Sequence, residues 1–305
     1  MQRFSINLLL FVFPLSLIYC WIALVYIPKL LNENWGPDTE TQIQQSFTNA
    51  EKRPYDMVFM GNSRIYRGLN PDSFTTKSYN FAHDNDSYNQ IYYKLLFLSA
   101  QNKKIQIVLL GVDYFQYSIF SDSRNYEYGK FLNKNYLTDY GKENYILDHY
   151  LNALHPLHLK EGQSLLETDQ DKCYQKNNGQ YYKAVTGVAS INDKGKYSIE
   201  RLNIQVKYFK KILTHCEKRN IKILLTMLPC RPCELINYSE KDRNEFHQFI
   251  STFLSNDVVL LNYVYDKRFS MSDFSDAVHF NPIGADKFSR IASDTIEIMR
   301  QRWNK

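Results

Sequence analysis

The sequence predicts an α/β fold, with a parallel sheet covered by helices on both faces and preceded by one amino-terminal transmembrane helix. Two observations predict it. Short strands that are apolar on both faces alternate with longer amphipathic stretches, as in a parallel sheet packed between two layers of helices. Ahead of them, residues 4–27 form 24 consecutive residues without a charge. At about 1.5 Å per residue, this stretch is long enough to cross the hydrocarbon core of a bilayer.

Composition narrows the class of protein. The chain has 305 residues, of which 44% are hydrophobic and 23% charged, and no low-complexity tract interrupts them. This composition is typical of a folded domain and not of a disordered chain. The 37 basic residues nearly balance the 32 acidic residues, which gives no support for a nucleic-acid partner.

Residues 1–29 are interpreted as a cytoplasmic tip followed by an uncleaved membrane anchor. The apolar stretch from Leu8 to Ile27 is longer than a usual signal-peptide core, and no small-x-small cleavage site follows it. A cleavable signal peptide is the competing interpretation. Arg3 precedes the span, whereas Lys29 on the other side is soon followed by three acidic residues. The positive-inside rule therefore predicts a single-pass protein of the cell membrane with a cytoplasmic amino terminus and an extracytoplasmic main domain.

The rest of the chain divides into a polar stalk or short helix at residues 30–54 and a domain at residues 55–305. The final helix is predicted to begin with Asn281 as its N-cap and Pro282 in its first turn. Residues 115–198 are rich in Tyr, Asn, Asp and Lys, and we interpret them as an insertion that forms a lid or recognises substrate; helices are expected within residues 132–159. The other expected strands are 55–60, 78–82, 105–110, 221–228 and 258–261, and the other helices are 87–100, 199–219 and 246–254.

The cysteines and histidines do not predict a metal site or a cofactor. Four cysteines lie beyond the membrane span, where oxidation can occur: Cys173, Cys216, Cys230 and Cys233. The motif of Cys230 and Cys233 follows a predicted strand and lacks the helix amino terminus that lowers a thiol pKa. We therefore favour a structural disulfide or two thiols, with a thiol oxidoreductase as a weaker alternative and the pairing left open. His155 and His158 alone are too few ligands for zinc.

Two places combine polar side chains with the ends of predicted strands, where open parallel sheets bind their ligands. Ser63 lies in a Gly-Asn-Ser-Arg turn after the first strand; the plain alternative is a helix N-cap. Asp276 stands three residues before His279, so its carboxylate can hold the imidazole Nδ1–H and leave Nε2 to accept a proton. A solvated loop histidine is the plain alternative there, and Asp273, six residues away, is a poorer partner. Ser63, His279 and Asp276 together complete a Ser, His and Asp set.

These motifs resemble those of the SGNH or GDSL-type hydrolases, in which a nucleophilic Ser follows the first strand and Asp-x-x-His precedes the final helix. The match covers residues 55–63 and 276–284. The resemblance implies a flavodoxin-like three-layer domain, with Ser63 as nucleophile, His279 as general base and then acid, and Asp276 as its orienting partner. Residue 62 is Asn where the commoner pattern has Asp.

The resemblance also implies an oxyanion hole in which a Gly and an Asn join the N–H of the serine. The corresponding segments of this chain contain Ala82 and Asp113. Ala82 can donate its backbone N–H. Asp113 as a carboxylate cannot donate and would oppose a developing oxyanion, and Asn80 is a candidate substitute. Loss of one such donor costs about 3 to 4 kcal/mol of transition-state stabilisation.

The anchor and the two motifs together resemble the membrane-anchored envelope branch of this family, which includes proteins of teichoic-acid D-alanylation and of polysaccharide O-acetylation. The resemblance implies a serine esterase or acyltransferase that uses an acyl-enzyme on an acylated glycan or lipid-linked polymer. Its partners would be the bilayer, through residues 4–27, and a membrane acyl donor in the case of transfer. The alternative is a catalytically weak or inactive SGNH-like envelope protein that binds glycan through the Tyr-rich insertion, and Asp113 favours it.

Overall fold

A computed structural model of the chain describes residues 2–29, 39–101, 103–121, 124–140, 145–154, 173–183 and 199–303. It contains a five-stranded sheet in the order β2-β1-β3-β6-β7, with every neighbouring pair parallel. This is the flavodoxin-like order, in which ligands bind where the chain reverses direction across the sheet. The predicted α/β class is confirmed. The strands are β1 (Met57–Met60), β2 (Ser78–Asn80), β3 (Ile107–Gly111), β6 (Lys222–Met227) and β7 (Val258–Asn262).

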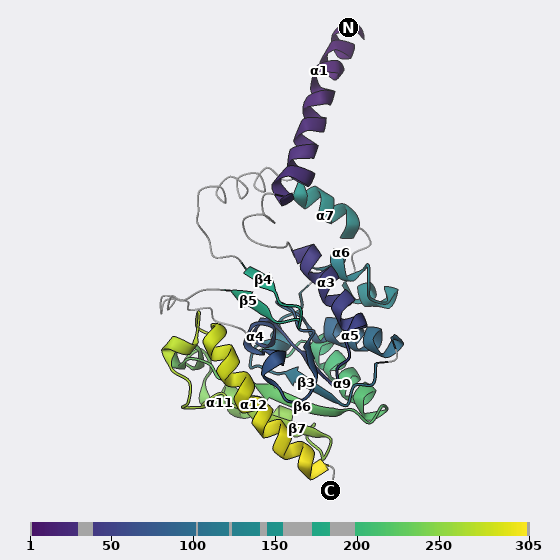
Figure 1. The fold of residues 1–305 in the computed structure, drawn as a ribbon. Helices are drawn as coiled ribbons and strands as arrows, with labels where there is room; N and C mark the ends of the chain where they lie inside the picture. The colour runs from purple at the N-terminus through teal and green to yellow at the C-terminus, as the bar shows by residue number, and fades with distance from the viewer. Residues whose placement is uncertain are drawn as a thin grey trace.

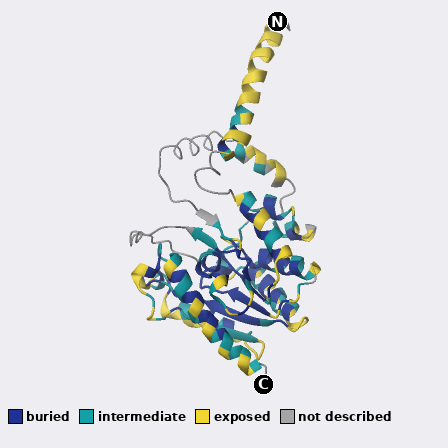
Figure 2. Cartoon of the chain, in the orientation of Figure 1, coloured by how far each residue is buried: buried dark blue, intermediate teal, exposed yellow. Residues whose placement is uncertain are grey.

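The sheet separates two hydrophobic clusters, one on each face. Val58 and Met60 of β1 belong to one cluster, whereas Met57 and Phe59 belong to the other, because successive strand residues point to opposite faces. Strands β1 and β3 are buried throughout, β2 and β6 are buried after their first residue, and the edge strand β7 is mostly half-buried (Figure 2). On the first face pack α3 (Thr39–Lys52), α5 (Tyr88–Ala100), α9 (Asn203–Glu217) and α11 (Glu240–Ser251), and on the second face pack α4 (Ser63–Gly68) and α12 (Pro282–Trp303) (Figure 1).

Capping side chains decide where several helices begin. Asn281 accepts a hydrogen bond from the Gly284 N–H at 3.0 Å, so it caps α12 as predicted. Helix α11 begins at Glu240, six residues before the predicted start, because Ser239 and Asp242 form a capping box there. The prediction used the spacing of apolar residues alone, and the first turns of α11 are polar, so it placed the start of the helix too late.

Residues 39–52 differ most from the prediction. They were expected to form a stalk or short helix ahead of the domain; they do form a helix, but α3 packs into the domain and buries Ile43, Phe47 and Ala50. The Tyr79 hydroxyl, on β2, donates to the Ser46 carbonyl at 2.8 Å. The apolar residues of α3 recur at helical spacing among polar ones. The domain core therefore includes residues that precede the predicted boundary at residue 55.

The insertion is described in parts. They are η3 (Gln116–Ser118), α6 (Asn125–Tyr128), η4 (Lys134–Tyr140), α7 (Tyr145–Ala153) and the antiparallel pair β4 (Cys173–Gln175) and β5 (Tyr181–Lys183). The turn of this hairpin packs on the end of β2, where the Asn80 N–H donates to the Asn178 carbonyl at 3.0 Å. Gly179 has φ of +90°, and a Cβ there would lie 1.9 Å from the Asn80 carbonyl oxygen. The hairpin therefore covers one end of the sheet. His155 and His158 lie outside the described residues.

The amino-terminal helix stands away from the domain (Figure 1). It comprises α1 (Gln2–Trp21), η1 (Ile22–Tyr26) and a last turn that ends at Lys29. Residues Arg3–Lys29 are long and apolar enough to cross a membrane. This helix fits the predicted single-pass anchor.

The short elements complete the chain: η2 (Pro71–Ser73), α10 (Pro232–Leu235) and η5 (Met271–Asp273). The motif of Cys230 and Cys233 was expected to lack a helix amino terminus. This expectation is wrong, because the one-turn helix α10 begins at Pro232, within the motif. Burial raises the pKa of the Cys216 thiol to about 12. The side chains of Cys173 and Cys233 lie outside the described residues, so the disulfide pairing stays a prediction.

Gly61, at the turn between β1 and α4, is expected to tolerate no side chain. Its φ is +154°, and a Cβ there would lie 2.6 Å from Ile65 Cγ1 and 3.3 Å from the Gly111 backbone. We expect Gly61→Ala to lower the free energy of unfolding by about 1–3 kcal/mol because of backbone strain. A urea titration of the full chain in detergent measures this. The control is Gly129→Ala, at an ordinary φ of −61°; equal losses in the two variants would contradict the prediction.

Candidate active site

The structure brings Ser63, His279 and Asp276 together. The Ser63 Oγ lies 2.7 Å from the His279 Nε2. On the other side of the ring, the His279 Nδ1 lies 2.8 Å from an Asp276 carboxylate oxygen. Residues 216 positions apart in the sequence thus form one chain of hydroxyl, imidazole and carboxylate. In this arrangement the imidazole can accept the hydroxyl proton while the carboxylate holds its tautomer.

The Ser63 hydroxyl is not used to cap α4. Asn62 is the N-cap instead, because its side-chain oxygen accepts the Arg64 N–H at 2.9 Å. The Ser63 N–H lies in the first helical turn and has no acceptor among the described residues. The plain alternative of an N-cap serine is therefore wrong, and both the hydroxyl and the N–H of Ser63 are available to a ligand.

A closed loop holds His279 in place before α12 begins. Phe274 and Phe280 form a β-bridge across the loop, and their rings stack with centroids 4.7 Å apart. Inside this bridge the Ser275 N–H donates to the His279 carbonyl at 2.9 Å. The loop is thus tied at its base, and the partly buried His279 ring has a hydrogen-bond partner at each of its nitrogens.

Asp276 is held as an ionised carboxylate. One of its oxygens accepts the backbone N–H groups of Val278 at 2.9 Å and His279 at 2.8 Å. Burial alone would raise the pKa of Asp276, but its bond to the His279 ring, the imidazole charge and these N–H groups hold the pKa below its ordinary value. Asp273 instead accepts from Lys287 Nζ at 3.0 Å, so it is not the partner of His279.

A buried ion pair lies behind the turn that carries Ser63, and no local pattern in the sequence indicated it. The Arg64 guanidinium donates to the carboxylate of Asp113, which follows β3, and both side chains are buried. Arg64 also donates to the carbonyls of Leu228 at 2.8 Å and Pro229 at 2.9 Å, beyond β6. One side chain therefore ties together the ends of β1, β3 and β6. Burial raises the pKa of Asp113, and the Arg64 charge, its hydrogen bond and that of Asn62 oppose this rise.

The two departures from the family pattern that the resemblance implied contact each other. The Asn62 amide nitrogen donates to Asp113 Oδ2 at 3.1 Å and to Gln116 Oε1 at 2.5 Å. An Asp at position 62 would be an acceptor only and would place a second carboxylate against Asp113. Asn62 therefore suits a chain that has Asp113, and the two positions are coupled.

The three oxyanion candidates are engaged in other hydrogen bonds. The Asn80 amide donates to the carbonyls of Ile65 and Leu69, each at 3.0 Å. Its side-chain oxygen accepts the Ala82 N–H at 3.1 Å, and Asp113 is paired with Arg64. This corrects the expectation that Ala82 or Asn80 supplies a donor. The Ala82 acceptor is the Asn80 side chain of β2 itself, whereas the Asn80 amide binds carbonyls in α4 and directly after it, which the strand ends alone did not reveal.

Arg67 is a further residue near the site, and its spacing of four from Ser63 on a helix was the available signal. Its guanidinium binds both oxygens of Asp84, at 3.1 and 2.8 Å, and lies 5.1 Å from the centre of the Tyr181 ring on β5. Arg67 and Tyr181 line a small hollow of about 20 Å³ together with Ser275 and Phe280, which flank the loop of His279. The insertion hairpin thus forms one wall beside the triad.

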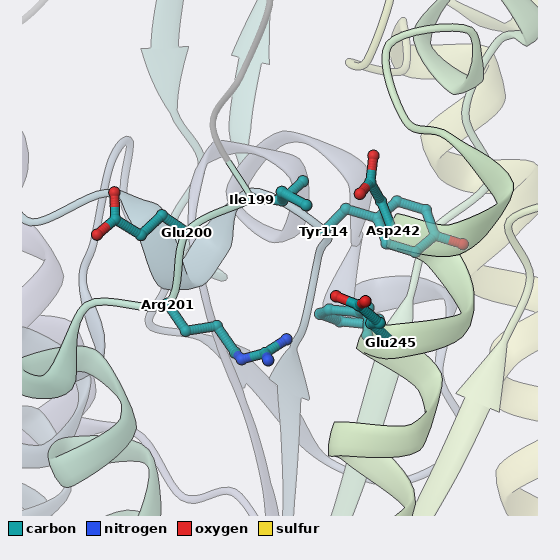
Figure 3. Close-up of a pocket in the computed structure, with 7 residues that line it drawn as sticks. Tyr114, Ile199, Glu200, Arg201, Asp242 and Glu245 are labelled. Carbon is teal, nitrogen blue, oxygen red and sulfur yellow. The ribbon is translucent and has the colours of Figure 1, made fainter.

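A larger cavity of about 350 Å³ lies elsewhere, between the start of α11 and the residues just before α9 (Figure 3). None of Ser63, Asp276 and His279 lines it. Among the described residues, no group of three or more His, Cys, Asp or Glu side chains could hold a metal ion. The residues that line the 350 Å³ cavity are Tyr114, Ile199, Glu200, Arg201, Asp242, Glu245 and Phe246.

Comparison with known proteins adds little. A family model that carries no functional description matches residues 188–300, and no curated protein matches the chain. Of 17 matching chains among the solved structures, one is a protein from Streptococcus pneumonia provisionally named a platelet activating factor. That alignment covers 93% of this chain and 98% of the other, with 12% identity and a TM-score of 0.38. Likeness at this level transfers no function, so the interpretation rests on the geometry of the site.

Breaking the buried ion pair is expected to destabilise the chain strongly. Asp113→Ala leaves the Arg64 charge buried without its partner, which costs about 3–5 kcal/mol of unfolding free energy. The control is Asp84→Ala, since the pair of Asp84 with Arg67 is partly exposed, with side chains 23% and 26% accessible, and we expect a loss near 1 kcal/mol. Urea titrations in detergent measure both. Similar losses in the two variants would show that Arg64 does not depend on Asp113.

The lowered pKa of Asp276 predicts a pH-dependent contribution to stability. A carboxyl with a depressed folded-state pKa stabilises the fold above its unfolded pKa of about 3.9, and this contribution disappears as the pH falls through the folded pKa. The difference in unfolding free energy between wild type and Asp276→Asn should therefore be largest at neutral pH and shrink below about pH 4. Urea titrations at neutral and acidic pH test it, and a difference that grows on acidification would contradict it.

Proposed function

We propose that this chain is an SGNH-type serine esterase or acyltransferase that forms an acyl-enzyme on acyl groups of a cell-envelope glycan or lipid-linked polymer. The observation that carries the proposal is the 2.7 Å contact between Ser63 Oγ and His279 Nε2, with Asp276 on the far side of the ring. The set stands at the carboxyl end of β1, at the topological switch point of the sheet.

The geometry supports a two-step acyl transfer. Ser63 Oγ attacks the ester carbonyl while His279 Nε2 takes the hydroxyl proton, and His279 then gives that proton to the leaving alcohol. Water or a sugar hydroxyl then attacks the acyl-enzyme while His279 Nε2 takes its proton. His279 returns that proton to Ser63 Oγ as the bond between Oγ and the acyl carbon breaks. Asp276, ionised by its surroundings, stabilises the imidazolium that forms in each step. Hydrolysis and transfer use the same residues and differ only in the acceptor.

Asp113 is a weaker objection to catalysis than its sequence position indicated. Its carboxylate is paired with Arg64 and accepts a bond from Asn62, so its charge is largely offset. The Ser63 N–H, which has no acceptor among the described residues, is the donor that a developing oxyanion would meet. This favours turnover through at least one oxyanion contact.

One further feature bears on the substrate class. The candidate membrane span at Arg3–Lys29 would keep the site at a membrane, where envelope polymers and lipid-linked precursors are found. An acylated envelope glycan or a lipid-linked polymer fits this location.

One observation favours a second candidate function, that of an inactive envelope protein that binds glycan. Ala82 and Asn80 are bonded to each other and to α4, which leaves one oxyanion donor where the family pattern implies three. Each missing donor costs about 3 to 4 kcal/mol, or two to three orders of magnitude in rate. A weak or absent turnover would then accompany glycan binding.

A fluorophosphonate probe tests the nucleophile. We expect the full chain in detergent to be labelled, Ser63→Ala to be unlabelled, and Ser251→Ala, on an exposed surface of α11, to be labelled like wild type. Asp276→Asn should lower the rate on a chromogenic acetyl ester by about 10⁴-fold, because the imidazole loses its tautomer partner. Wild-type protein that resists the probe, or Ser63→Ala protein that labels equally, would count against the proposal.

Measuring glycan binding alongside ester cleavage separates the two candidates. Acetyl release that depends on Ser63 supports the enzyme. Binding of an O-acetylated envelope glycan with equal affinity by wild type and Ser63→Ala, without acetyl release by either, selects the binding protein.

A further inference from the structure

Helix α7 of the insertion exposes an apolar face, which consists of Ile146, Leu147, Tyr150 and Leu151. These side chains are 44% to 56% exposed. At 100° per residue they span an arc of about 140°, so they form a single face of the helix. The His149 ring stacks on Tyr126 with centroids 3.6 Å apart, and the Tyr150 hydroxyl lies 3.3 Å from the Tyr126 hydroxyl. The contact with the domain therefore lies at one side of the apolar face, and Leu147 and Leu151 lie further round the helix from it.

No comparable group of apolar side chains is exposed elsewhere in the described part of the domain. Apart from α1 and α7, the large exposed apolar side chains there are scattered singly, which is normal for a protein surface. A contiguous apolar group instead marks an interaction site. The scattered residues are Ile236, Leu254, Tyr265, Met271, Ile283 and Ile298.

The α7 face lies where the amino-terminal helix reaches the domain. The Tyr19 hydroxyl of α1 donates to the carbonyl of Leu154, directly after α7, at 2.5 Å. Figure 1 shows α7 at the base of α1, and Figure 2 shows its exposed surface. A hydrocarbon core of about 30 Å, counted from Phe4, takes about 20 residues and ends near residue 23. Ala23 and Ile27 are buried, whereas Leu24, Val25 and Tyr26 are exposed, so one side of the amino-terminal helix meets protein just beyond Tyr19, at about the level of α7.

We infer that α7 lies in the surface of the same membrane that α1 crosses, with its apolar face against lipid. Amphipathic helices bind at this depth, with the apolar side about 5–10 Å into the boundary between headgroups and acyl chains. Tyr150 on this face, and Tyr19, Trp21 and Tyr26 on the neighbouring helix, are of the residue types enriched at that level. We assign the bilayer as the partner of this face because the exposed apolar side chains of α7 continue those that α1 presents to lipid.

Two contacts with the bilayer restrict how the domain can tilt and turn. Helix α12 begins at Pro282, shortly after His279. Figure 1 shows the amino-terminal end of α12 on the side of the molecule that faces α1, and its carboxyl end on the far side. With α7 in the membrane surface, the edge of the sheet that carries Ser63 would be held toward the bilayer. This consequence rests on the proposed function, whereas the position of α7 does not.

Photocrosslinking in vesicles tests the position of α7. The photoreactive residue p-benzoylphenylalanine replaces Leu151 in the full chain, which is reconstituted in vesicles of phosphatidylcholine and phosphatidylglycerol and irradiated. We expect a lipid adduct in the intact mass spectrum. The same residue in place of Phe11, exposed on α1, should also give a lipid adduct. In place of Ile298, equally exposed on α12 at the far end of the domain, it should give none.

The outcomes distinguish the occupants of the face. A covalent dimer at position 151 without a lipid adduct would assign the face to a second copy of the chain and overturn the inference. Positions 147 and 151 that both fail to capture lipid, while position 11 succeeds in the same vesicles, would also overturn it. Because the measurement needs no ester cleavage, its failure is independent of a failure of the proposed enzyme.

Discussion

The ion pair between Arg64 and Asp113 is the contact on which the geometry of the site depends. Both side chains are buried, and Arg64 also binds two carbonyls beyond β6. A charge in such a place must keep all its partners, since an unpaired buried charge is costly. Ser63 is the residue next to Arg64. The backbone of Ser63 can therefore shift little without disturbing the ends of three strands, and this restraint keeps its hydroxyl within reach of the His279 ring.

The polar contacts behind the site continue into the insertion. Gln116, which accepts from Asn62, donates to the Asp86 carbonyl at 2.8 Å. The Asp86 carboxylate is in turn buried against Lys94 at 2.6 Å and the Tyr128 hydroxyl of α6 at 2.6 Å. A connected network of this kind constrains its members to one arrangement. The insertion is thus joined to the turn that carries Ser63 at one end, while Leu154, directly after α7, accepts a hydrogen bond from Tyr19 of the amino-terminal helix at the other.

Several predictions from local pattern agree with the structure because they depend on neighbouring residues only. Apolar runs ended by polar residues marked the strands, and Asn281 with Pro282 marked the start of α12. Helix α3 shows the limit of this reasoning. Its few apolar residues among polar ones are typical of a solvated helix as well as of a packed one, and only contacts with distant segments, such as Tyr79 with Ser46, decide between them.

The sequence by itself determined the fold class, the amino-terminal apolar helix and the residue types of a Ser, His and Asp set, because periodicity, length and side-chain chemistry are local properties. Only the tertiary structure decided that Ser63 meets His279, that Asn62 and not Ser63 caps α4, and that Ala82, Asn80 and Asp113 have other partners. The physical reason is that a hydrogen bond depends on distance in space. Strands far apart in the chain lie adjacent in a parallel sheet, so the partners of a strand-end residue come from segments that its own neighbours do not reveal.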